Sequence, residues 1–196
     1  MRLLPSGDKA ILVDCADAGE ARVWAAFLGE HLPVTLGAQT VLVHANRAEV
    51  QRLVAELEQD KTATVVNTQS REHTLAVSYD GPDLNLVAKH TGLGASEIVE
   101  AHTSAILTVG FSGFAPGFAY LVDGDARLTV PRLAAPRPNV AAGSVALAGA
   151  FSGIYPRESA GGWLIIGHTR EWLWDLSRDQ PARLQPGDTV RFEAIG

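Results

Sequence analysis

The stretch GFSGFAPGFAYL, residues 110–121, opens the glycine-rich half of this 196-residue chain. Ten glycines and five prolines lie between residues 110 and 167, and only short β-compatible runs separate them. Glycine and proline mark turns, and short strands between many turns are typical of a closed barrel or a sandwich. This half is therefore predicted to be a β-rich domain that carries its functional residues on loops.

The residues before this half alternate the patterns of strands and helices. Apolar and β-branched runs at 10–13 and 40–43 predict strands. Asp17 with Glu20, and Asn46 with Glu49, have the spacing of helix starts. Two apolar stripes with helical spacing follow: Val23, Trp24, Phe27 and Leu28, then Val50, Leu53, Val54 and Leu57. A further strand at 75–79 is expected to close this small α/β lobe, and the boundary of the lobe, 1–75, is placed at the start of that strand.

Composition and charge exclude several classes of protein. Hydrophobic residues make up 46% and charged residues 19% of the chain, as in ordinary folded domains. The formal net charge of -6 offers no basic surface, so nucleic acid is excluded as a partner. Neither the first residues nor the weakly polar run at 140–151 fits a signal peptide or a membrane span, so we expect no membrane association and a cytoplasmic location. Cys15 is the only cysteine, which excludes an internal disulfide and a multi-cysteine metal site.

Arginine is concentrated in one acid-free part of the glycine-rich half. Residues 126–157 contain four arginines and no acidic residue: Arg127, Arg132, Arg137 and Arg157. The planar guanidinium group suits two-pronged binding of carboxylate or phosphate. The cluster therefore indicates either an anionic ligand or acidic partner surface, or arginines that are solvated or paired with acids elsewhere in the fold.

Signatures of a self-sufficient catalytic site are absent from the sequence. There is no phosphate-binding loop of the G-x-x-x-x-G-K-[ST] type, no G-x-G-x-x-G, no H-E-x-x-H and no G-x-S-x-G. The six histidines lack the spacing of metal ligands, so no metal site is expected. His102 fits either a general acid or base or a packed, hydrogen-bonded histidine.

The glycine-rich half resembles a known family in the order and spacing of its motifs. These motifs are GFSGFAPGFAYL (110–121), VPR (130–132), PR (136–137), GSV (143–145), SGIYP (152–156), GGW (161–163) and GHT (167–169). They are similar to the KipI / allophanate hydrolase subunit 1 family, which includes the B subunit of bacterial 5-oxoprolinase. YDGPDL (79–84) and the last residues fit as well, so the resemblance covers essentially the whole chain. It implies an α+β fold: the N-terminal α/β lobe, 1–75, followed by a cyclophilin-like β-barrel, 76–196.

The resemblance implies three alternative functions. The B subunit works with the C subunit (KipA, or allophanate hydrolase subunit 2-like) and with the A subunit to open 5-oxo-L-proline to L-glutamate with ATP hydrolysis. A related domain pair forms the carboxyltransferase part of urea carboxylase, and a third member inhibits a sporulation histidine kinase. The lack of a biotin-carrier or carboxylase segment favours the first over the second. ATP with its Mg²⁺ is then expected at a site that a partner supplies or completes, and the isolated chain is expected to be inactive.

For a 5-oxoprolinase, the site must bind a phosphoryl group and a developing oxyanion. The candidate substrate-binding residues are Arg132, Arg137, Ser144, Tyr155, Trp163 and Thr169. His102 is the candidate catalytic acid or base. His168 departs from the family pattern, because an arginine is usual at this position.

Overall fold

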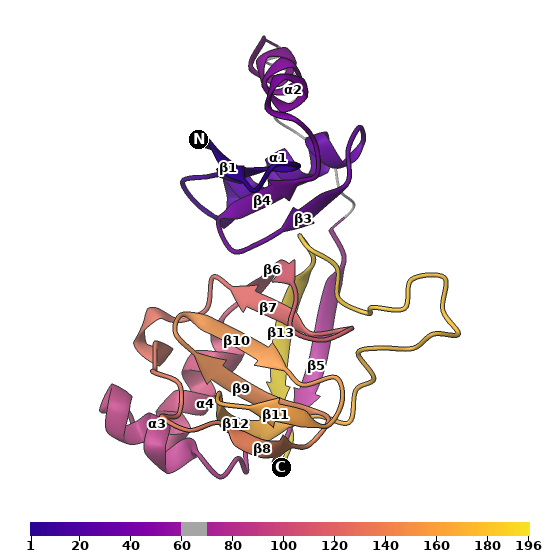
Figure 1. The fold of residues 1–196 in the computed structure, drawn as a ribbon. Coiled ribbons are helices and arrows are strands. Elements are labelled where there is room, and N and C mark those ends of the chain that lie inside the picture. Colours follow the sequence, from indigo (N-terminus) through magenta and orange to yellow (C-terminus); the bar gives the residue numbers. More distant parts are fainter. Residues whose placement is uncertain (60–69) are drawn as a thin grey trace. The chain divides into compact units, whose positions relative to one another are not determined.

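The computed structural model describes residues 1–59 and 70–196, and it divides the chain into two compact units, Met1–Gln69 and Ser70–Gly196 (Figure 1). Each unit has its own buried apolar core. Among the described residues, no helix is both long and apolar enough to cross a membrane.

The first unit is a four-stranded antiparallel sheet with two helices. Its strands are β1 (Arg2–Ser6), β2 (Ala10–Asp14), β3 (Val34–Leu36) and β4 (Thr40–Val43), in the order β1-β2-β4-β3, and its helices are α1 (Ala18–Gly29) and α2 (Arg47–Gln59). Asp17 caps α1 by accepting from the backbone N–H of Glu20 at 2.8 Å, and Asn46 accepts from that of Glu49 at 3.0 Å. Both predicted helix starts are therefore confirmed. The side chain of Leu57 lies outside those described.

The second unit is a nearly closed, barrel-like sheet. Its seven strands are β5 (Glu72–Val77), β6 (Leu107–Ser112), β7 (Ala119–Val122), β9 (Ser144–Ala148), β10 (Phe151–Ile154), β12 (Leu164–His168) and β13 (Thr189–Ala194). They are ordered β12-β9-β10-β7-β6-β13-β5. Ser78 and His168 exchange two backbone hydrogen bonds of 2.9 and 2.8 Å, which bring the two ends of the sheet together. The predicted α+β class with a barrel-like second domain is confirmed.

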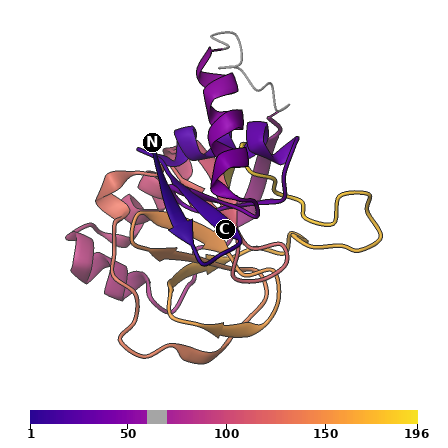
Figure 2. The same cartoon turned by 45° about the horizontal axis from the view of Figure 1, so that its top comes forward.

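Smaller elements complete the second unit. Helices α3 (Leu84–Thr91) and α4 (Ala95–Ser104) lie beside each other against the sheet, with the short 3₁₀ helix η1 (Ala126–Leu128) in contact with both (Figure 1). Strands β8 (Arg137–Val140) and β11 (Ser159–Gly161) form a separate two-stranded sheet. The long segment between β12 and β13 projects away from the rest of this unit (Figure 2).

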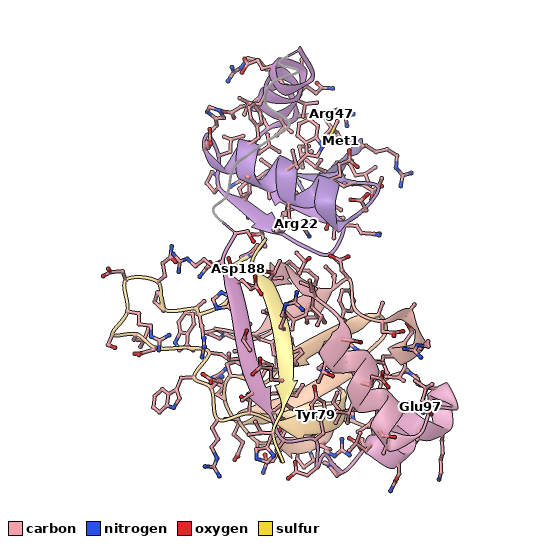
Figure 3. The ribbon with its side chains drawn as sticks, turned by 180° about the vertical axis from the view of Figure 1, so that it is seen from behind. Met1, Arg22, Arg47, Tyr79, Glu97 and Asp188 are labelled. Atoms are coloured by element: carbon pink, nitrogen blue, oxygen red, sulfur yellow. The ribbon has the colours of Figure 1, made fainter. Side chains whose placement is uncertain are left out.

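The strand expected at 75–79 begins earlier and belongs to the second unit. β5 pairs in parallel with β13 over six residue pairs, from Glu72↔Thr189 to Val77↔Ala194. The buried carboxylate of Asp188, near the start of β13, accepts from the backbone N–H of Arg71 at 3.0 Å and bonds His73 Nε2 at 2.9 Å. Figure 3 shows Asp188 at one end of this strand pair and Tyr79 at the other. The expected boundary at 75/76 thus lies inside β5, because a pairing with residues more than a hundred positions away fixes the strand.

The two faces of the sheet bury different side chains. In β9, Val145 and Leu147 belong to the main core with α3 and α4, whereas Ala146 and Ala148 belong to a second, aromatic cluster. Because successive side chains of a strand point to opposite faces, these two clusters lie on opposite sides of the sheet. The candidate site residues divide between these faces.

Candidate functional site

One face of the second unit is covered by a continuous group of aromatic rings, here called the aromatic face. Its members are Phe111, Phe114, Phe118, Tyr120, Phe151, Tyr155 and Trp163. Phe118 joins the two candidate aromatic residues, since its ring centroid lies 5.5 Å from that of Tyr155 and 5.4 Å from that of Trp163. Edge-to-face contacts of this kind hold aromatic rings in fixed positions. The GFSGFAPGFAYL, SGIYP and GGW motifs therefore meet on a single rigid surface inside the unit, since Phe118, Tyr155 and Trp163 are each at most 5% exposed.

Arg132 lies over this surface. Its Cζ is 5.9 Å from the centroid of the Trp163 ring, and its side chain is exposed. A guanidinium group over an indole face is held by cation–π attraction and keeps its N–H donors free. Burial raises the pKa of Tyr155 above its ordinary value, which keeps its phenol protonated, although the nearby Arg132 opposes this shift. The face thus offers a positioned, exposed cation at Arg132, whereas the neutral hydroxyl group of Tyr155 lies inside the unit, since this residue is only 2% exposed.

Phe114 extends the aromatic face into solvent. Its side chain is 60% exposed, while its ring edge contacts Phe118 and Tyr155. The backbone of Phe114 has a φ of 67°, in the left-handed region that a bulky side chain rarely adopts. An exposed aromatic ring in a strained conformation is expected where another molecule binds.

Arg137 is placed differently from Arg132. Its Nη2 donates to Asp83 Oδ1 at 2.6 Å, and Asp83 Oδ2 accepts from the backbone N–H of Ile165 at 2.7 Å. The Asp83 side chain is only 6% exposed, so this ion pair ties β8 to α3 and β12 inside the unit. The Nη1 of Arg137 is buried and has no hydrogen-bond partner among the described residues.

The arginine cluster is therefore divided in two. Arg127 and Arg137 are paired with Asp125 and Asp83, as the second interpretation of the cluster required. Arg132 and Arg157 make no ion pair with any residue of the described ranges 1–59 and 70–196. These two remain available for an external anion.

Ser144 and Thr169 lie together at one end of the aromatic side, around the turn at Gly143. Gly143 has a φ of 81°, and a Cβ there would lie 2.2 Å from the Thr169 carbonyl oxygen, so only glycine fits. The backbone N–H of Tyr155 donates to the Ser144 carbonyl at 3.0 Å, and Thr169 Oγ1 accepts from the backbone N–H of Glu171 at 3.2 Å. Both side chains are buried. Their hydrogen bonds position the ends of β9, β10 and β12.

His102 lies on the opposite face, apart from the other candidates. Its Nδ1 is 2.7 Å from Tyr79 Oη and its Nε2 is 2.8 Å from Ser152 Oγ. Its ring stacks on Phe192 at a centroid distance of 4.4 Å and is 2% exposed. Burial lowers the pKa of His102 to about 3, so it is neutral at pH 7, and burial raises the pKa of Tyr79, so its phenol stays protonated.

A cavity of about 150 Å³ adjoins this histidine. Its apolar walls include Leu107, Leu128 and Leu147, and both His102 and Ser152 line it. The sequence did not identify Tyr79 and Ser152 as the partners of His102. It also did not identify Asp83 as the partner of Arg137. Tyr79 and Asp83 both lie in the YDGPDL segment, whose polar residues beside a helix start were the available signal. The described residues contain no group of three or more His, Cys, Asp or Glu that could hold a metal ion.

Comparison with known proteins identifies related chains. Residues 1–184 match the family model described as the carboxyltransferase domain, subdomain C and D. The chain is similar to a protein named as the B subunit of 5-oxoprolinase from Escherichia coli O157:H7, with 50% identity over 112 residues, 57% of this chain and 51% of that protein. Proteins of the same name from Haemophilus influenzae and Bacillus subtilis are 41% and 36% identical, over 75% and 85% of this chain and 68% and 67% of theirs. The match thus spans about half the length of the first of these relatives and two thirds of the others.

Solved structures show the same fold. A conserved uncharacterized protein, PH0987 from Pyrococcus horikoshii, is 30% identical with a TM-score of 0.61, and the match covers 99% of this chain and 97% of that one. TTHA0988 is 28% identical with a TM-score of 0.80, over 96% of this chain and 40% of that one. The Kluyveromyces lactis urea carboxylase has a TM-score of 0.75 over 99% of this chain and 22% of its own, and at 18% identity it shows the fold alone.

Proposed function

Because the chain belongs to the carboxyltransferase-domain family, subdomains C and D, together with the B subunits of 5-oxoprolinases, we propose that it is the B subunit of a 5-oxoprolinase. In this role it would open 5-oxo-L-proline to L-glutamate with ATP hydrolysis, in a cytoplasmic complex with the C and A subunits. The observation that supports a site on this chain is Arg132, an exposed cation without an acidic partner in the described residues, held over Trp163.

The chemistry of the reaction requires such a group. A lactam amide is a poor electrophile, and transfer of the γ-phosphoryl group of ATP to its oxygen activates the ring carbon for attack by water. Ring opening then breaks the C–N bond, the nitrogen takes a proton, and a second water releases phosphate. Arg132 would bind the anionic carboxylate or phosphoryl group. The hydroxyl of Tyr155 is expected to support this site from below rather than to touch the substrate, because Tyr155 is only 2% exposed.

The remaining candidates would position this site. The ring beneath Arg132 belongs to Trp163. The strands around it would be held by the hydrogen bonds of Arg137, Ser144 and Thr169 described above. ATP and Mg²⁺ would be held at a site that a partner supplies or completes, because the sequence has no phosphate-binding loop.

Replacing Arg132 with alanine in the reconstituted complex is expected to lower 5-oxoproline-dependent ATP hydrolysis by about ten- to a hundredfold, since one charge-assisted hydrogen bond is lost. Phosphate release and glutamate formation measure this effect. Arg127→Ala is the matched control, because Arg127 is exposed and already paired with Asp125, and it should keep wild-type rates. Equal rates in both variants would remove Arg132 from the site, and no turnover by the complete wild-type complex would refute the proposed function.

Phe114→Gly is expected to weaken binding to the partner protein by about tenfold while leaving the isolated chain folded, because the exposed ring is lost from the surface. Glycine adopts a φ of 67° without strain, and this gain offsets the lost contacts with Phe118 and Tyr155. Calorimetric titration with the partner measures the affinity, and thermal unfolding serves as the control. Wild-type affinity would show that the partner binds another surface.

A further inference from the structure

The hydrogen bonds around His102 fix where each proton lies. A neutral imidazole has one N–H donor and one acceptor nitrogen. Tyr79 Oη has one hydrogen to donate, and its only hydrogen-bond partner among the described residues is His102 Nδ1 at 2.7 Å. A phenol is a stronger hydrogen-bond donor and a weaker acceptor than the hydroxyl of a serine, because its oxygen shares electrons with the ring. Tyr79 therefore donates to Nδ1, and the proton on Nε2 is donated to Ser152 Oγ, 2.8 Å away.

This arrangement leaves Ser152 with an unused donor. Its oxygen accepts from His102, so its own hydrogen must find a different acceptor, and the described residues supply none. Ser152 is 3% exposed, and a buried donor without an acceptor is unfavourable. Ser152 and His102 both line the cavity of about 150 Å³, into which the hydroxyl hydrogen can point.

The lining of the cavity selects a type of ligand. Leu107, Leu128 and Leu147 suit an apolar body, and a volume of about 150 Å³ holds a single small ring. The lining residues include no lysine or arginine, whereas Asp123 and Asp125 belong to it. Asp125 is already paired with Arg127, but these carboxylates still disfavour an anion.

The geometry points to a second ligand site in this cavity, which takes a small neutral carbonyl compound, an amide or a lactam, whose oxygen accepts from Ser152. The Tyr79–His102–Ser152 chain is a row of donors that strengthen one another toward the ligand. His102 acts here as a positioning residue. The site goes beyond the proposed function, because 5-oxo-L-proline carries a carboxylate and would bind beside Arg132 on the opposite face.

The test uses the full chain with ¹⁵N-labelled histidine and 2-pyrrolidinone, a neutral lactam, as the probe. We expect the His102 spectrum to show a proton on Nε2, and its signals to shift saturably with 2-pyrrolidinone but not with 5-oxo-L-proline. Ser152→Thr keeps the hydroxyl and should retain binding. Ser152→Val has the same shape without the hydroxyl, and its affinity should be at least about tenfold lower. Ser104→Ala, an exposed hydroxyl of the same helix as His102, is the unaffected control.

A second variant keeps the proposal testable if Ser152→Val unfolds. Ala105→Leu fills the cavity from its wall while leaving all three hydrogen-bonded side chains in place, so it should keep the Nε2 proton and lose the response to the probe. A proton on Nδ1, no saturable response in the wild type, or undiminished binding by Ala105→Leu would each overturn the site. None of these outcomes bears on Arg132, so this site and the proposed function can fail separately.

Discussion

Replacing Asp83 with alanine is expected to lower the free energy of unfolding by about 3 kcal/mol, because it leaves the largely buried guanidinium group of Arg137 without its counter-ion. The same change removes the acceptor of the Ile165 backbone N–H. The Arg137 side chain is 30% exposed, so solvent compensates in part, and the effect belongs at the lower end of those known for broken buried pairs. Both losses act where α3, β8 and β12 meet.

Urea denaturation followed by tryptophan fluorescence measures this change. A Trp24→Phe background restricts the signal to the second unit, since the other three tryptophans all lie after residue 70. Asp80→Ala is the matched control. Its carboxylate is 62% exposed and pairs with His168 at the surface, so its loss should cost less than about 1 kcal/mol. Similar values for the two variants would mean that the Asp83–Arg137 pair does not stabilise the fold.

A double-mutant cycle separates the interaction energy of the Asp83–Arg137 pair from the effect of changing each side chain alone. Arg137→Met replaces the cation with an apolar side chain of similar length but strands the Asp83 carboxylate, so it should destabilise the unit as well. Adding Asp83→Asn to Arg137→Met removes the stranded charge and keeps an acceptor for Ile165. The double variant should therefore lose less than the sum of the two single changes. This result would show that the interaction between Asp83 and Arg137, and not either side chain alone, stabilises the second unit.

Local signals accounted for most of the first unit. Asp17 and Asn46 cap helices through backbone groups only three residues away, so the information lies within one turn. The barrel class of the second unit followed from glycine and proline content and from the family motifs. The assignment of β5 failed because its alternating pattern does not reveal its neighbour, and β13 lies more than a hundred residues later.

The candidate site was predictable only in part, for a related reason. Motif positions pointed to Arg132, Tyr155 and Trp163, and the structure brings them onto one face. The partners of the buried polar groups were not predictable, since Asp83 lies 54 residues before Arg137, and Ser152 lies 50 after His102. Motif order alone therefore placed His102 with residues from which the sheet separates it.

The buried histidine should make the protein sensitive to acid. The pKa of His102 falls from its ordinary value of 6.5 to about 3 in the folded chain, because burial disfavours the charged ring. Between these two values the unfolded chain binds a proton that the folded chain does not, so stability falls as the pH falls. It should be constant above about pH 6.5 and decrease by about 1.4 kcal/mol per pH unit below it.

Carboxylates also titrate in this range, so the expected result is a difference between variants. Wild type should lose about 2 to 3 kcal/mol more than His102→Asn between pH 6.5 and 4.5, since asparagine keeps polar groups toward Tyr79 and Ser152 but does not titrate. Urea denaturation in the Trp24→Phe background at half-unit steps measures both slopes. His90→Asn removes an exposed imidazole from α3 and should keep the wild-type slope. Parallel curves for wild type and His102→Asn would mean that His102 accepts a proton as readily in the folded chain as in the unfolded one, which its enclosure by Tyr79, Ser152 and Phe192 opposes.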